Sequence, residues 1–237
     1  MVLIFCLLPS VTAFTLPQAS SQRYEASRDS SVRLANEAAR RGEELRRKWD
    51  LDGAETAFRQ AVAFDPTNVT AALGLARIAR VRFDYAAAIR LLGGANKNHP
   101  RSADLLTEYG EIYLAAEEAA RAREYFESAL KIDSSTEAAI IGRARVDLLE
   151  RDYKSAEARL RALVARNPEN SHAHAWLARA LIESNRNRDA ALEAERAIAL
   201  DEYEAEALAT LAFIRGTERK PDEVRAFARR AIALDPL

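Results

Sequence analysis

The chain has 237 residues, of which 49% are hydrophobic and 30% are charged, so it can form a packed core rather than a disordered tail. Its 35 Lys and Arg against 36 Asp and Glu give a net charge of -1, which argues against a nucleic-acid partner. One Cys excludes a disulfide framework and a Cys-based zinc site, and three His leave little for a metal cluster, so we expect no cofactor.

Residues 1–20 begin with the uncharged apolar run MVLIFCLLPSVTAF. This run is too short for a transmembrane span, which needs ~20 apolar residues. It is typical of the apolar core of a secretory signal, with Val11–Ala13 as the cleavage site. We therefore predict a signal peptide and export to the periplasm or the cell exterior. The alternatives are an N-terminal apolar segment that is not a signal and a cytoplasmic protein, because the basic residues that usually start a signal are missing.

Residues 21–34 are mainly polar and are expected to form a solvated lead-in to the first helix. Ser30 and Ser31 are suitable N-cap residues for that helix, because a Ser hydroxyl can accept a hydrogen bond from an unpaired backbone N–H.

A 34-residue period begins after this lead-in. Pro66, Pro100, Pro168 and Pro236 are 34, 68 and 68 residues apart. With the proline at place 32, the units are 35–68, 69–102, 103–136, 137–170, 171–204 and 205–237, without insertion or deletion. Proline stops a helix, so each unit is expected to end there.

Places 8, 20 and 27 of the units are occupied by small residues, and sixteen of these eighteen positions are Gly or Ala. The residues are Gly42, Ala76, Gly110, Ala144, Ala178 and Ala212; Ala54, Ala88, Ala122, Ala156, Ala190 and Val224; and Ala61, Ala95, Ala129, Leu163, Ala197 and Ala231. Small side chains let two helices approach closely. We therefore predict two helices per unit, for example over 103–116 and 119–132, with larger apolar residues such as Phe126 packed around the contact.

These residues resemble the tetratricopeptide repeat, whose period and pattern of small, aromatic and proline positions they match. The third unit, LLTEYGEIYLAAEEAARAREYFESALKID, matches best, and the resemblance covers residues 35–237. It implies an all-α fold, a right-handed superhelical solenoid of antiparallel helix pairs in which the first helices line a concave groove.

The resemblance also implies which residues face this groove. They are Arg77, Glu111, Arg145, Arg179, Trp176, Phe213 and His172. Arg and Trp are favoured anchors in interfaces, and Arg binds carboxylates through two hydrogen bonds. We expect a protein partner with an acidic or carboxylate-bearing segment. Alternatively, Arg is simply the common polar residue of this chain, and Glu111 pairs with neighbouring Arg side chains.

No catalytic constellation is found. His172 and His174 are two residues apart, so they point in different directions on a helix and do not form a metal site. The sequon Asn68-Val69-Thr70 is either a glycosylation site or an accidental match.

The sequence therefore predicts a non-catalytic scaffold that binds a peptide or helix of a protein partner in its groove. The alternative is the regulatory or substrate-presenting region of a larger or truncated enzyme, since the chain ends directly after its last unit. That final unit lacks a polar capping helix, and self-association through it is a further expectation. RNA binding is disfavoured because the net charge is near zero and Glu is mixed with Arg along the groove.

Overall fold

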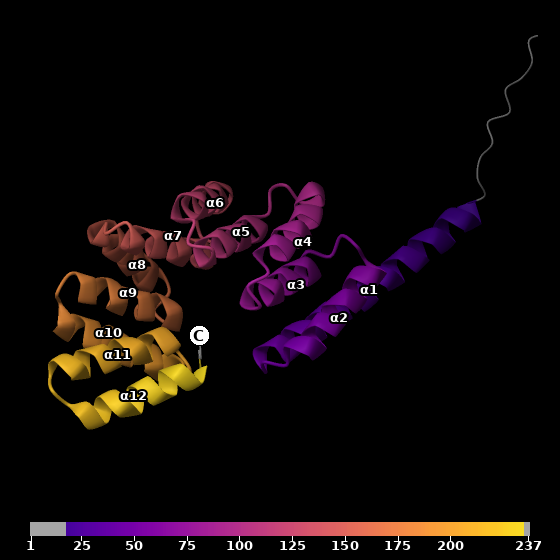
Figure 1. Cartoon of the computed structure of the whole chain (residues 1–237). Coiled ribbons are helices and arrows are strands. Elements are labelled where there is room, and N and C mark those ends of the chain that lie inside the picture. Colours follow the sequence, from indigo (N-terminus) through magenta and orange to yellow (C-terminus); the bar gives the residue numbers. More distant parts are fainter. Residues whose placement is uncertain (1–17, 235–237) are drawn as a thin grey trace, which may run out of the picture. The chain divides into compact units, whose positions relative to one another are not determined.

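The computed structural model describes residues 18–234, and within this range the chain forms twelve α-helices and no strand (Figure 1). The helices are α1 (Gln18–Arg47), α2 (Leu51–Phe64), α3 (Val69–Val81), α4 (Tyr85–Asn98), α5 (Ala103–Ala115), α6 (Ala119–Ile132), α7 (Glu137–Leu149), α8 (Tyr153–Arg166), α9 (Ser171–Glu183), α10 (Asn187–Leu200), α11 (Ala205–Thr217) and α12 (Pro221–Leu234). The first helices α3, α5, α7, α9 and α11 start at residues 69, 103, 137, 171 and 205, which are 34 residues apart. The predicted all-α array of helix pairs is confirmed.

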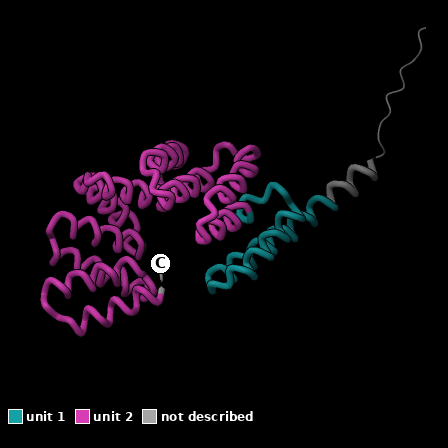
Figure 2. The backbone as a smooth tube through the Cα atoms, viewed as in Figure 1, with its two compact units in different colours: residues 1–71 teal, residues 72–237 magenta. Residues whose placement is uncertain are grey.

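The chain divides into two compact units, residues 1–71 and 72–237 (Figure 2). In the first unit α1 packs against α2. Helix α1 already begins at Gln18, so the expected lead-in over 21–34 is helical, and the prediction that Ser30 and Ser31 cap a helix is wrong. Their hydroxyls instead donate to the carbonyl oxygen of Ser27, at 2.8 and 3.1 Å, inside the helix.

The predicted apolar segment over residues 1–20 lies largely outside the described residues, apart from 18–20 at the start of α1. None of the helices in the described range is both long enough and apolar enough to pass through a lipid bilayer.

Asn68 directly precedes α3 and caps it, rather than presenting a free amide at the surface. The residue is only 8% exposed. Its side-chain oxygen accepts a hydrogen bond from the backbone N–H of Ala71, and its side-chain nitrogen donates to Asn36, both at 2.9 Å. The structure therefore favours an accidental match at the Asn68-Val69-Thr70 sequon, because a glycosylated amide needs to face solvent.

Each first helix ends in a turn with the same hydrogen-bond pattern. In the turn after α7, the N–H of Arg151 donates to Leu148 at 3.1 Å and the N–H of Asp152 donates to Asp147 at 2.8 Å, so two final carbonyls of the helix are satisfied. The residue at the position of Arg151 has a positive φ of about 60° in all six turns. These residues are Trp49, Phe83, Glu117, Arg151, Asn185 and Arg219. Since none of the six is glycine, each such backbone carries a cost of ~1–2 kcal/mol.

The core of each helix pair is formed at the predicted small positions. Ala122 and Phe126 are fully buried. The ring of Phe126 occupies the space that glycine leaves on two first helices: a Cβ added at Gly110 would lie 2.6 Å from this ring, and one at Gly142 would lie 2.3 Å from it. The small residues therefore make room for a large ring as well as for a neighbouring helix.

Candidate functional site

A pocket of about 440 Å³ lies in the second unit, beside α7 and α9. Its walls come from three first helices, one turn and the start of α8. We name it the α7–α9 pocket, and it is lined by Leu114, Arg145, Leu148, Leu149, Arg151, Tyr153, Trp176, Arg179 and Glu183. The volume falls in the usual range for ligand pockets, roughly 300–1,000 Å³, and the lining combines apolar walls with a few charged groups.

Arg145 is held from two sides in this pocket. Its Nη1 donates to both carboxylate oxygens of Glu111 on α5, at 2.8 and 3.0 Å. Its guanidinium carbon lies 4.9 Å from the ring centroid of Trp176 on α9, a cation–π contact. The structure thus brings together three of the residues predicted for the groove. It also shows the pairing of Glu111 with an Arg of the next repeat, which the alternative interpretation required.

Arg179 lies on the same side of the pocket and also has acidic neighbours. Its Nε donates to Glu183 at 3.2 Å, and its Nη1 donates to Glu206 on α11 at 3.5 Å. Burial raises the pKa of the Glu206 carboxyl above its ordinary value, although the charge of Arg179 acts in the opposite direction. About half of the Arg179 side chain remains exposed, so it can still meet a ligand.

His172 and His174 point in different directions, as their spacing predicts. Nδ1 of His172 lies 2.5 Å from the buried Glu204, and this hydrogen bond is the main cause that raises the pKa of the imidazole. His174 is buried, with Nδ1 at 2.6 Å from Glu193 and Nε2 at 3.0 Å from the carbonyl oxygen of Pro168. The described residues contain no group of three side chains suited to a metal ion.

Arg77 and Phe213 lie outside the α7–α9 pocket. Nε of Arg77 on α3 donates to the buried Glu108 at 3.0 Å, which Arg80 also contacts. Phe213 on α11 is 55% exposed. The predicted groove residues are therefore distributed over several places, and only some of them line one pocket.

Sequence reasoning missed Arg151 and the leucines around it. Arg151 follows α7 in the turn with positive φ, whereas the groove prediction considered only positions within the first helices. Leu114, Leu148 and Leu149 form apolar walls, and Leu149 is 63% exposed. Nothing in the sequence marks this place, because the exposure of Leu149 is known only from the structure.

Three arginines, Arg145, Arg151 and Arg179, and one glutamate, Glu183, line the pocket. From outside this lining, Glu111 pairs with Arg145 and Glu206 contacts Arg179, so the charges around the pocket are nearly balanced.

Models of the tetratricopeptide repeat family match residues 39–93, 82–145 and 147–212, which is more than half of the chain. The chain belongs to the tetratricopeptide repeat family. Arrays of this kind typically serve as scaffolds for protein–protein interaction. No curated protein is similar enough in sequence to count as a relative of this tetratricopeptide repeat protein.

Several solved structures share its fold. The type IV pilus biogenesis factor PilW is similar with a TM-score of 0.65 and 22% identity, over 86% of this chain and 94% of PilW. A tetratricopeptide repeat protein from Parabacteroides merdae has a TM-score of 0.68 and 16% identity, over 92% of this chain and 84% of that one. PilF from Pseudomonas aeruginosa has a TM-score of 0.61 and 15% identity, over 90% and 93% of the two chains. At these identities the likenesses show the fold alone.

Proposed function

We propose that this tetratricopeptide repeat protein is a non-catalytic scaffold that binds a peptide or helix of a protein partner at the α7–α9 pocket. The observation that carries the proposal is the fixed geometry around Arg145. Because Glu111 and Trp176 already hold this side chain, little conformational entropy is lost when a ligand packs on it. Aromatic and Arg side chains in such a setting are typical interface anchors.

Because two arginines of the pocket are already paired, we expect charge to contribute less to the binding of a partner than the sequence suggested. Arg145 is engaged by Glu111 and Arg179 by Glu183, so a partner carboxylate competes with these glutamates. We therefore place most of the affinity in apolar contact with Trp176 and the neighbouring leucines. Charge then contributes to the orientation and the association rate of the partner.

The proposal is tested by capturing partners from native extract and quantifying them by mass spectrometry. The pocket variant is Arg145→Glu/Arg179→Glu, and the matched control is Arg161→Glu/Arg188→Glu on α8 and α10, where both arginines are exposed. We expect the pocket variant to lose partners that the wild type and the control retain, with all three proteins equally helical by circular dichroism. Equal recovery by all three proteins would refute the proposal.

Export and self-association are two further parts of this proposal. Export rests on the apolar residues 1–20, and sequencing the N-terminus of the mature protein tests it, since cleavage near Ala13 is expected. Self-association through the last helix pair rests on Ile232 of α12, which is 63% exposed. Sedimentation equilibrium of the wild type and of Ile232→Glu tests it, because an unchanged monomeric mass for both contradicts it.

A further inference from the structure

We infer that Arg151 recognises a carboxylate at the α7–α9 pocket, and that the segment bound there carries a large apolar side chain beside an aspartate or glutamate. This inference rests on the proposed function and names the chemistry of the partner. It assigns a binding role to a turn residue rather than to a residue of a first helix.

Arg151 differs from the other two arginines of the pocket because its positive charge is not paired with a carboxylate of any described residue. Arg145 pairs with Glu111, and Arg179 contacts Glu183. Among residues 27–233, whose side chains the structure describes, the guanidinium of Arg151 has no ion-pair partner, and a large part of this residue is exposed. An uncompensated cation at the edge of a pocket attracts a carboxylate more strongly than one that is already paired.

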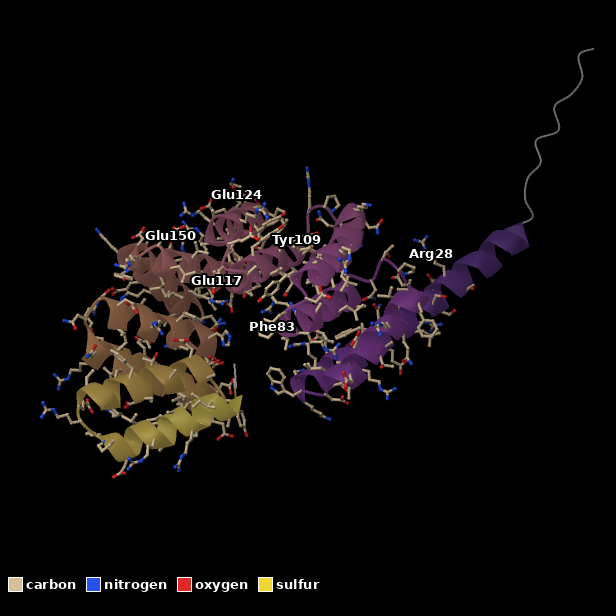
Figure 3. The ribbon with its side chains drawn as sticks, in the orientation of Figure 1. Arg28, Phe83, Tyr109, Glu117, Glu124 and Glu150 are labelled. Carbon is tan, nitrogen blue, oxygen red and sulfur yellow. The ribbon has the colours of Figure 1, made fainter. Side chains whose placement is uncertain are left out.

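The acidic residues on either side of Arg151 are engaged elsewhere. Glu150, which Figure 3 labels, forms an ion pair with Arg123 on α6. Asp152 caps α8, because its carboxylate accepts a hydrogen bond from the backbone N–H of Ser155 at 3.1 Å. Hydrogen bonds from the side chain of Ser155 and, second, from its backbone N–H lower the pKa of Asp152, so the carboxylate remains ionised and remains on the cap. Neither neighbour therefore neutralises Arg151.

The apolar part of the pocket lies next to this charge. Leu148 and Leu149 directly precede the turn, and Trp176 and Leu114 complete the walls. Leu149 is 63% exposed, so a partner side chain that covers it removes apolar surface from water. Because Leu149 and Arg151 are only two residues apart, one short segment can contact both.

The backbone of Arg151 provides a test that separates binding from folding. Its φ is 62°, a conformation that glycine adopts without strain. Arg151→Gly therefore removes the side chain and also relieves the turn. Arg219 has a φ of 59° in the corresponding turn after α11 and lies outside the pocket. Arg219→Gly is the matched control, because it changes the same residue type at the same backbone geometry.

The probe is a displayed library of random short peptides, selected on the full chain. We expect the enriched peptides to combine Phe, Trp or Leu with Asp or Glu one or two residues away. Arg151→Gly should weaken their binding by about two- to fivefold, as expected for one partly exposed charged contact. Arg219→Gly should leave binding unchanged. Each glycine variant should melt about 1–3 °C higher than the wild type, because relief of the left-handed backbone outweighs the larger conformational entropy that glycine loses on folding. The loss at Arg151 should shrink at high salt.

Two failures are distinguishable. If the selected peptides depend on Trp176 but contain no acidic residue and bind Arg151→Gly as tightly as the wild type, the inference about Arg151 is wrong and the proposed site stands. If no peptide is enriched, or if binding is unaffected by both Trp176→Ala and Arg145→Glu, the proposed site itself is wrong and the inference fails with it.

Discussion

Gly142→Ala is expected to destabilise the protein, although alanine is the better helix former. In an unconstrained helix interior this change stabilises by about 0.5–1 kcal/mol, because glycine loses more backbone entropy on folding. At Gly142, however, the added Cβ would lie 2.3 Å from Cε1 and Cζ of Phe126. Real Cβ atoms do not approach a ring so closely, so either the ring or the helix has to move.

The ring of Phe126 has little space to move into. It is completely buried, and a Cβ at Gly110 on the opposite helix α5 would lie only 2.6 Å from it. Overpacking of this kind costs about 1–3 kcal/mol, which exceeds the gain in helix propensity. We therefore expect a net loss of about 1–2 kcal/mol for Gly142→Ala.

The assay is urea-induced unfolding followed by circular dichroism. The matched control is Gly94→Ala in α4, where an added Cβ has no atom within 4 Å, so a gain of about 0.5–1 kcal/mol is expected. Phe126→Leu replaces the ring with a smaller side chain and should therefore remove most of the stability that Gly142→Ala costs. A double-mutant cycle measures this coupling. If Gly142→Ala stabilised the protein as much as Gly94→Ala does, the packing argument would be refuted.

Three further predictions concern the core and the charged groups. Ala122→Phe places a ring where the present side chain is fully buried, so it should cost about 1–3 kcal/mol, and an unchanged melting temperature would contradict the packing. Asp147→Asn removes the charge from a carboxylate that is 1% exposed and paired with Arg143. The free energy of unfolding in urea should therefore fall by about 3 kcal/mol, and an unchanged urea midpoint would show that the pair contributes nothing to stability. The pKa of His172 is raised in the folded protein, so its contact with Glu204 stabilises the fold fully at pH values below the pKa that histidine has in the unfolded chain. This stabilisation is lost as the pH rises through the pKa of His172 in the folded protein. An NMR titration of His172 should therefore have its midpoint above that of the Glu204→Gln variant, and coinciding midpoints would contradict this.

The sequence was sufficient for the helices and their core because both depend on contacts that recur in every unit. Small residues at fixed places and a proline at the end of a unit are visible in a single chain. They correctly indicated, for example, helices near 103–116 and 119–132, with Ala122 and Phe126 between them. Polarity was a poorer guide at the N-terminal side, where residues 21–34 are helical even though their composition is that of a solvated segment.

Only the tertiary structure decided which charged groups are already paired. The carboxylate that holds Arg145 belongs to Glu111 of the preceding repeat, a contact that depends on the angle between neighbouring helices and on two flexible side chains. A repeat period fixes neither quantity. The role of Arg151 was hidden for a different reason, because a non-glycine residue in a turn gives no sign in the sequence that its backbone is left-handed. The regular spacing of the chain therefore specifies the scaffold, while the chemistry of its pocket depends on how adjacent repeats place their side chains against one another.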